Sequence, residues 1–469
     1  MTTLDLDDIQ GIILRRYPMP VARHFLLAVR DPAAARAALG LLVSGDEAAA
    51  PQVSSSATPV PTIAYRLYVG ITWPGLVALE VTDRVPSLSF RSFPAFVAGA
   101  AARAVMLGDS GASAPEHWIS GFGSDSGHVL VTLYGRGRAE LAEYSDRLSA
   151  LFTCNDAFSE IWRGDGEALI EKDQNGVSGY VRKAHFGYTD AITEPVIRGG
   201  PGPYPPERQQ PCDPWIFVLM DEAPNYYVPD PPELGRNGSF AVFRIEEQDV
   251  AGFENFLQSQ KDRIDPELLA AKLMGRWRNG VPLALSPDTD SPPGGIAPDQ
   301  LNNFDYVNAD GSGDPWGERT PIGAHIRRVN PRGQPIKGQG VPGGSNNDHR
   351  ILRRALPYGP TYVPSEPYDG IERGLIGHFI NAIIENQFEF VLREWINNAD
   401  AVGAVRLDPH SKGVITGTND PSDSVFEIPQ PGGASPIRIT GFSSFTTTRA
   451  TAYCFLPSIT ALKFIAGLR

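Results

Sequence analysis

The sequence predicts an α+β protein in which a ferredoxin-like unit of antiparallel strands and covering helices occurs twice. Three observations support this fold class. An apolar run of strand length is followed directly by a segment of helical period, this pairing occurs three times in each half of the chain, and a proline-rich stretch separates the halves. The helical segments are amphipathic, so we expect peripheral helices on one face of each antiparallel sheet.

The predicted elements follow the same order in both halves. In the first half, strand and helix pairs are expected at 24–29 and 32–42, 65–71 and 74–79, and 128–134 and 138–152. In the second half they are expected at 239–245 and 248–260, 375–383 and 385–397, and 450–456 and 458–466. Phe253, Phe256 and Leu257 stand at i, i+3 and i+4, which places them on one helical face. The sequence leaves open whether the strands form two packed sheets or one continuous sheet.

The composition divides the 469 residues into two predicted domains and a connection. Residues 1–195 are expected to form an N-terminal ferredoxin-like domain, and residues 239–469 a C-terminal one. The segment 196–238 is rich in proline and is predicted to connect them. A chain of this length has room for two or three domains at about 150 residues each.

The charge balance excludes several classes of partner. Lys and Arg number 41 and Asp and Glu 54, so the formal net charge is −13. We therefore expect no nucleic-acid or membrane partner, since both favour a basic face. Three widely spaced cysteines predict neither a disulfide framework nor a zinc site. With no export signal and no long apolar stretch recognised, we expect a soluble cytoplasmic protein.

Common catalytic motifs are missing from the sequence. It has no Gly-x-Ser-x-Gly elbow, no Walker A loop, no zincin helix, and no Gly-x-Gly-x-x-Gly after a strand. The run Asn308-Ala-Asp-Gly-Ser-Gly-Asp314 is similar to a calcium loop but lacks the bidentate Glu that completes one. Hydrolase, nucleotide-binding and calcium-binding functions are therefore disfavoured.

The segment 325–354 concentrates positive charge. It contains seven Arg or Lys residues, six of them Arg, and a single acid, Asp348. Arg favours planar, bidentate contact with carboxylates and phosphates, so the segment predicts a ligand with two carboxylates or a phosphorylated ligand. The alternative is a solvated face with scattered ion pairs.

A second segment, His185-Phe-Gly-Tyr-Thr-Asp-Ala-Ile-Thr-Glu-Pro195, places an acid in a glycine turn. Gly187 allows a tight turn, and Asp190 stands near apolar neighbours. The carboxylate could serve a catalytic site, or it could simply bind its own backbone as turn aspartates do.

Read together, these segments resemble the dye-decolourising peroxidases. The matching motifs are Gly187-Tyr-Thr-Asp190-Ala191, Gly323-Ala-His325-Ile-Arg-Arg-Val-Asn-Pro-Arg332, and Ile351-Leu-Arg353-Arg354. Asp7-Asp-Ile-Gln-Gly11, Lys272-Leu-Met-Gly-Arg276-Trp and Asn386-Gln-Phe-Glu-Phe390 resemble the family's opening, middle and late segments. The resemblance covers nearly the whole chain. It implies duplicated ferredoxin-like domains of the dimeric α+β barrel type, with haem in the C-terminal half.

The resemblance also implies the site residues and the cofactor, haem b (iron protoporphyrin IX). His325 matches the proximal ligand of the haem iron, and Glu385 stands where relatives supply a carboxylate that orients this histidine. Asp190 and Arg353 match the distal pair, which moves a proton and stabilises charge during peroxide cleavage. Arg276 and Arg332 match the positions that hold the haem propionates.

The implied function is a haem peroxidase that uses hydrogen peroxide to oxidise dyes, phenols or other small aromatic one-electron donors. One alternative is a haem-binding or haem-handling protein, similar to a deferrochelatase, with weak peroxidase turnover. Another is a duplicated α+β binding module without haem. The sequence is compatible with a homo-oligomer. Ala191 replaces the usual Gly, and Gly377 replaces a usual Phe, which implies a wider and wetter pocket.

Overall fold

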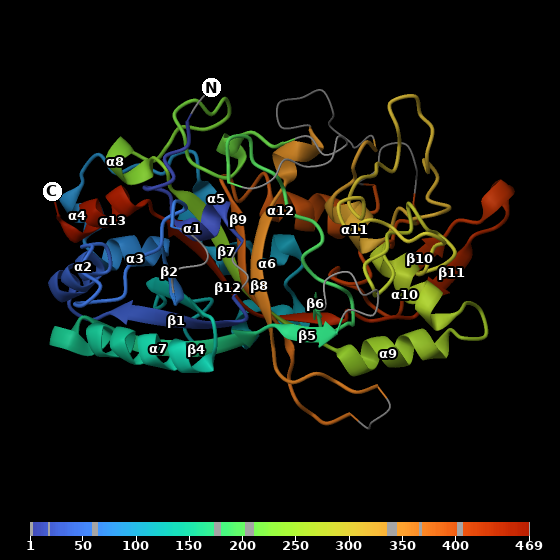
Figure 1. The fold of residues 1–469 in the computed structure, drawn as a ribbon, viewed down its shortest axis with the longest axis horizontal. Coiled ribbons are helices and arrows are strands. Elements are labelled where there is room, and N and C mark those ends of the chain that lie inside the picture. Colours follow the sequence, from blue (N-terminus) through green and yellow to red (C-terminus); the bar gives the residue numbers. More distant parts are fainter. Residues whose placement is uncertain are drawn as a thin grey trace.

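The computed structural model describes residues 3–16, 19–58, 64–172, 180–201, 211–334, 345–364, 368–400 and 407–468. An eight-stranded antiparallel sheet of strand order β4-β1-β3-β2-β12-β7-β9-β8 spans the molecule (Figure 1). The first half supplies β1 (Val21–Val29), β2 (Tyr65–Ile71), β3 (Val129–Gly135) and β4 (Phe158–Glu167). The second half supplies β7 (Ser239–Gln248), β8 (Leu352–Tyr358), β9 (Gly374–Asn381) and β12 (Thr446–Leu456). The halves join where Phe455 of β12 pairs with Ile71 of β2.

The predicted α+β class with antiparallel strands and peripheral helices is confirmed, and all six predicted strands are present. The six predicted strands lie in one continuous sheet, which answers the question that the sequence left open. Two strands of this sheet, β4 and β8, were not predicted, because charged residues interrupt their apolar character in FSEIWRGDGE and LRRALPY. The small hairpins β5–β6 and β10–β11 were not predicted either. The domain boundaries at 195 and 239 stay a prediction, and residues 202–210 of the connection lie outside the described residues.

The two ends of the sheet approach each other, as expected of a barrel. A Cβ atom added at Gly166 of β4 would lie 2.9 Å from Leu356 Cβ of β8. Across the interior, the rings of His24 on β1 and Phe243 on β7 have centroids 5.1 Å apart. The strands of both halves therefore share one interior, which their inward-facing side chains fill.

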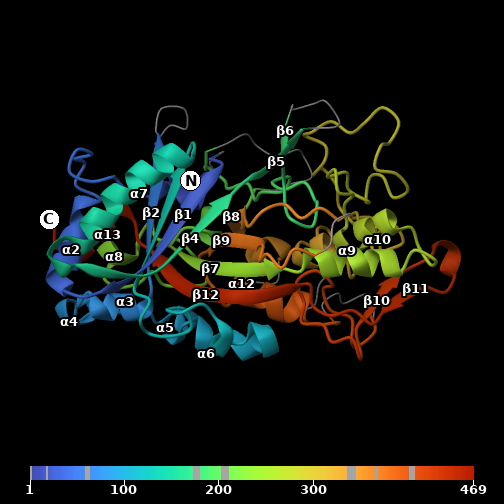
Figure 2. The ribbon, with the colours of Figure 1, turned by 90° about the horizontal axis from the view of Figure 1, so that it is seen from below.

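Helices cover the outside of this sheet (Figure 2). In the first half α7 (Arg138–Thr153) lies along β1, β3 and β4, while α5 (Pro94–Ala98) and α6 (Ala100–Leu107) pack near β12. The C-terminal α13 (Ile459–Ala466) packs against α2 (Pro32–Leu41) and α8 (Pro232–Gly235). The remaining short elements of this half are α1 (Gly11–Leu14), α3 (Trp73–Ala78), α4 (Val81–Arg84), β5 (Leu169–Lys172) and β6 (Tyr180–Lys183).

The second half carries the helices that surround the predicted site. They are α9 (Val250–Ser259), α10 (Pro266–Met274), α11 (His325–Val329), α12 (Phe388–Phe390) and a π-helical turn at Val391–Ile396, with the hairpin β10 (Val425–Ile428) and β11 (Ile437–Thr440) beside them. Asp249 and Asp265 cap α9 and α10 by accepting hydrogen bonds from Gly252 N and Leu268 N. Within the described residues, no helix has the length and apolarity needed to cross a bilayer.

A buried polar chain links the two halves inside the barrel. The Thr132 hydroxyl lies 3.0 Å from His24 Nδ1 and 2.9 Å from His378 Nε2. Burial lowers the pKa of His24 to about 3, and it lowers the pKa of His378 well below its ordinary value. Both imidazoles are therefore neutral at physiological pH, although both become protonated more readily when the chain unfolds.

This difference predicts a pH-dependent stability. Because the folded-state pKa is depressed, each buried histidine costs stability as the pH falls from about 6.5 towards its folded pKa, by about 1.4 kcal/mol per pH unit. We expect His24→Asn to reduce proton uptake on unfolding by about one proton between pH 6 and 4. Urea unfolding of both proteins across this pH range measures the difference. Identical pH slopes would show that His24 is not buried as a neutral group.

Candidate active site

A cavity of about 330 Å³ is lined by residues of both halves of the chain. Strands β7, β8 and β9 line it together with α11, the π-helical turn and the segment that follows β6. Its volume lies within the range typical of small-ligand sites. The predicted residues that line it are Asp190, His325, Arg332 and Arg353. Residues separated by more than 160 positions in the sequence thus meet at one site.

His325 is the first residue of α11 and contributes a neutral imidazole to the cavity. Burial, followed by the nearby positive charge of Arg353, lowers the pKa of His325 to about 4. Its Nδ1 atom is buried and has no hydrogen-bond partner in the described part of the chain. A neutral imidazole with an unpartnered nitrogen is suited to bind a metal.

Three buried arginines, two of which line the cavity, have no carboxylate partner among the described residues. Arg276 is 6% exposed and donates to the carbonyls of Gly280 and Leu301. Arg332 donates to the carbonyls of Asn302 and Phe304. Burial lowers the pKa of Arg276 to about 9 and that of Arg332 to about 10, and Arg350 is shifted in the same direction. Arg332 and Arg350 line the cavity directly, while Arg276 is not among its lining residues.

Burial is the main cause of these shifts, and the positive charge of neighbouring guanidinium groups adds to it. Carbonyl oxygens orient the guanidinium groups but carry no full charge. Arg276 and Arg332 each hold their positive charge at a cost in desolvation. An anionic ligand in the cavity would remove this cost, and a ligand with two carboxylates matches the bidentate geometry of Arg.

Asp190 and Arg353 occupy another part of the lining. The Asp190 side chain is 41% exposed, and its Oδ2 lies 3.5 Å from Arg16 Nη2. Arg353 Nη2 donates to the carbonyl oxygen of Thr193 at 3.2 Å. A carboxylate and a guanidinium therefore face one cavity together with the neutral imidazole of His325.

The chain was compared with known proteins. No family model matches it. It is 29% identical to dye-decolorizing peroxidase msp1 of Mycetinis scorodonius, over 99% of this chain and 88% of that protein. It is 27% identical to dye-decolorizing peroxidase AauDyP1 of Auricularia auricula-judae, over 98% of this chain and 87% of that protein. It is 25% identical to multifunctional dye peroxidase DyP2 of Amycolatopsis sp., over 98% of this chain and 95% of that protein.

Solved structures agree with these relatives. A dye-decolorizing peroxidase variant in complex with cyanide matches with a TM-score of 0.81 and 26% identity, over 99% of this chain and all of that one. A dye-decolorizing peroxidase in complex with 2,6-dimethoxyphenol matches with a TM-score of 0.80 and 27% identity, over 99% of this chain and all of that one. The likeness thus extends over both halves of the fold.

Over nearly its whole length the chain is similar to dye-decolourising peroxidases in both sequence and fold, which supports this family. Its function class is that of a haem peroxidase of the dye-decolourising type, and the family implies a haem pocket. The predicted family, fold class and enzyme class are confirmed.

The position of Glu385 in this peroxidase differs from expectation. Glu385 lies in the turn before α12, and it does not line the cavity. Its Oε1 accepts a hydrogen bond of 2.6 Å from Ala95 N, and its Oε2 is buried without a partner in the described residues. Burial raises the pKa of this carboxyl. In the described part of the chain no hydrogen bond joins it to His325, so its role as the orienting carboxylate stays a prediction.

Two lining residues of this peroxidase were not singled out from the sequence. His349 stacks on Phe390 with ring centroids 3.8 Å apart, and its Nδ1 lies 2.5 Å from the carbonyl oxygen of Asn386. Arg350 follows it directly. Both lie in the Arg-rich segment, and its charge density was the signal that could have assigned Arg350 to the site.

Ala191 adopts the backbone that the family's usual Gly favours. Its φ is 73°, in the left-handed region, so the turn after Asp190 is kept despite the added methyl group. This conformation costs a non-glycine residue about 1–2 kcal/mol. The turn of this peroxidase is therefore strained rather than displaced.

We expect Ala191→Gly to raise the free energy of unfolding by about 1 kcal/mol, since relief of strain exceeds the entropy that glycine adds to the unfolded chain. Chemical denaturation measures this change. Ala184→Gly, at a position without positive φ, is the matched control and should destabilise slightly. Equal losses in both variants would contradict the strain at Ala191.

Proposed function

We propose that this chain binds haem b in the cavity through His325 and uses hydrogen peroxide to oxidise small aromatic one-electron donors. One observation carries the proposal. A single cavity unites the neutral imidazole of His325, the guanidinium groups of Arg332 and Arg353, and the Asp190 carboxylate. These are the groups that an iron tetrapyrrole with two acid side chains requires.

The donor set fits this cofactor. The described residues contain no group of three or more His, Cys, Asp or Glu side chains that could hold a metal ion. A lone histidine suits an iron whose other ligands come from a macrocycle. Arg332, with Arg276 behind it, would bind the propionates by charge-assisted hydrogen bonds. Glu385 would orient His325 through its buried Oε2, which has no partner in the described residues, while its Oε1 accepts from the Ala95 amide.

When bound, haem supplies the redox chemistry that reduces peroxide and accepts electrons one at a time from a donor. Asp190 and Arg353 then act on the peroxide itself. The Asp190 carboxylate takes a proton from one peroxide oxygen and returns it to the other, which leaves as water. The Arg353 guanidinium stabilises the negative charge that develops on the departing oxygen. The contact with Arg16 holds the Asp190 carboxylate at the cavity wall.

Removing the axial ligand should abolish haem binding. We expect His325→Ala to purify with less than a tenth of the haem of the unaltered protein, as measured by the absorbance of bound porphyrin and by iron content. His349→Ala is the matched control, because His349 lines the same cavity but lies outside the ligand motif. If His325→Ala retained haem and His349→Ala lost it, the assignment of His325 as the iron ligand would be wrong.

Altering the distal pair should leave haem bound but slow the reaction with peroxide. We expect Asp190→Asn to reduce the rate constant by about 10²- to 10⁴-fold, because proton transfer is lost. Arg353→Leu should reduce it by about 10²- to 10³-fold, because charge stabilisation is lost. Stopped-flow absorption with one equivalent of peroxide measures both rates. A haem-loaded unaltered protein that fails to react would favour the haem-handling alternative instead.

A further inference from the structure

The cavity extends past the distal residues, across β9 to β7. Gly377 of β9 pairs with Ala355 of β8 on one side and with Arg244 of β7 on the other. Residues directly opposite in antiparallel strands share a face, and two strand spacings amount to about 10 Å. A Cβ atom at Gly377 would lie 2.2 Å from the Arg354 carbonyl oxygen, so the approach of β8 leaves no room for a side chain. The sheet face is therefore open between Arg353 and Arg244.

We call the part of the cavity lining that β7 and its neighbours form the side chamber. Its residues are Arg244, Glu246 and Gln248 of β7, Leu375 of β9, Thr446 of β12 and Thr416. Arg244, Glu246 and Gln248 alternate along β7 and so point to the same face. The register places Glu246 opposite Leu375, and Gln248 opposite Thr446. The side chamber thus continues the surface that carries Arg353.

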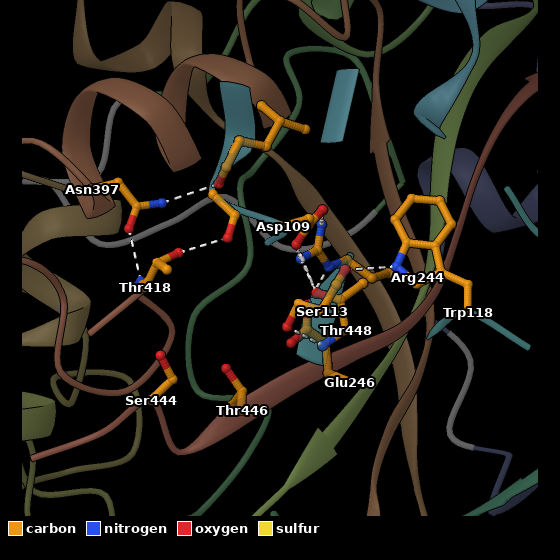
Figure 3. A network of polar contacts seen from close by, with 12 residues as sticks. Asp109, Ser113, Trp118, Arg244, Glu246, Asn397, Thr418, Ser444, Thr446 and Thr448 are labelled. Atoms are coloured by element: carbon orange, nitrogen blue, oxygen red, sulfur yellow. Dashed lines mark hydrogen bonds and ion pairs between the residues drawn. The ribbon is translucent and has the colours of Figure 1, made fainter. Parts of the chain in front are cut away.

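An ion cluster forms the floor of the side chamber (Figure 3). Arg244 Nη1 donates to Asp109 Oδ2 at 3.0 Å, and Arg244 Nε donates to Glu246 Oε1. The Thr448 hydroxyl donates to Asp109 Oδ1 at 2.8 Å. The side chains of Arg244 and Asp109 are 6% and 5% exposed. One guanidinium is thus shared by two carboxylates, so this cluster carries a formal charge of −1.

Glu246 is the carboxylate of this cluster that a ligand can reach. Its side chain keeps 21% of its surface exposed and lines the cavity, whereas Asp109 is buried behind Arg244. Burial raises the pKa of Glu246. The carboxylate is therefore placed to accept a hydrogen bond, and a proton, from a molecule in the side chamber.

Two further polar atoms in the side chamber have no partner in the described residues. Gln248 is 6% exposed, and its Oε1 is buried without a hydrogen bond. Thr416 Oγ1 is likewise unsatisfied. A buried polar atom without a partner costs about 1–3 kcal/mol, so each is a place where a ligand or a water gains a hydrogen bond. Leu375, Leu392 and Ile396 supply apolar lining nearby.

We propose that Glu246 is a donor-binding residue of this peroxidase, which accepts a hydrogen bond from the hydroxyl or amino group of a neutral aromatic donor in the side chamber. This inference rests on the proposed peroxidase function and adds a positioning residue to that site. The negative charge of the cluster disfavours sulfonated or carboxylated aromatics. The apolar lining favours a phenol or an arylamine over a sugar or an amino acid.

The oxidation step balances with the groups present. The phenol O–H bond breaks, its proton passes to the Glu246 carboxylate, and one electron passes to the cofactor that peroxide has oxidised. The product is an aryloxyl radical, which leaves the chamber, and Glu246 then releases its proton to solvent. A second phenol molecule supplies the second electron in the same way.

Direct binding tests the proposal without turnover. Isothermal titration calorimetry of the resting haem-loaded protein uses 2,6-dimethoxyphenol and, as a matched ligand without a donor, 1,2,3-trimethoxybenzene. The unaltered protein should bind the phenol at least tenfold more tightly, since a hydrogen bond to a charged group is worth about 1.5–3 kcal/mol. Glu246→Gln should weaken phenol binding about tenfold and leave trimethoxybenzene binding unchanged. Gln248→Ala should also weaken phenol binding.

Glu247→Gln is the matched control, because Glu247 points to the opposite face of β7 and contacts Arg449. It should bind the phenol as the unaltered protein does. Equal phenol affinity in Glu246→Gln, Gln248→Ala and Glu247→Gln, with haem bound in all of them, would overturn the side chamber as the binding site while leaving the proposed peroxidase intact. Failure of the unaltered protein to take up haem would overturn both proposals.

Discussion

The structure depends on positive charge that is held inside the protein without an internal counter-charge. Arg276 and Arg332 are fixed by backbone carbonyls, and burial lowers their pKa values to about 9 and about 10. The buried Arg327, by contrast, is neutralised by Asp314 at 3.0 Å. Among the described residues, no carboxylate forms an ion pair with Arg276 or Arg332, and the carboxylates that line the cavity are paired with other arginines. The folded protein therefore retains buried positive charge, and an acidic ligand would relieve the desolvation cost of that charge. The neutral imidazole of His325 indicates that this ligand also carries a metal.

The fold places these groups through simple strand and helix geometry. Arg353 and Arg354 are adjacent on β8, and alternation sends them to opposite faces. Arg353 faces the cavity and contacts the Thr193 carbonyl, while Arg354 binds Glu194 and the Ile12 carbonyl. The same alternation on β7 brings Arg244 and Glu246 to the face of Arg353. One sheet face thus carries both Arg353 and the chamber proposed for the donor.

Much of the fold and the position of the cavity could be predicted from local sequence. Apolar runs and helical periods indicate six of the strands, and the Arg-rich segment indicates the cavity. β8 could not, since Arg353 and Arg354 interrupt it and its stability comes from pairing with β9. The contact of Glu385 with Ala95 joins residues 290 positions apart, and no local pattern encodes such a contact. Glu246 was missed for a related reason. A charged residue on a strand indicates a binding site only when the strand register shows which residues lie opposite it, and the register is not encoded in a local sequence pattern.

The central claim is that the buried guanidinium groups select a tetrapyrrole by its two acid side chains. Its most direct test is titration of the haem-free protein with iron protoporphyrin IX and with the dimethyl ester of the same porphyrin, which lacks both negative charges but keeps the iron and the ring. The account predicts that the ester binds at least 100-fold more weakly, because two charge-assisted interactions worth about 1.5–3 kcal/mol each are lost. Equal affinity for the two porphyrins would contradict it.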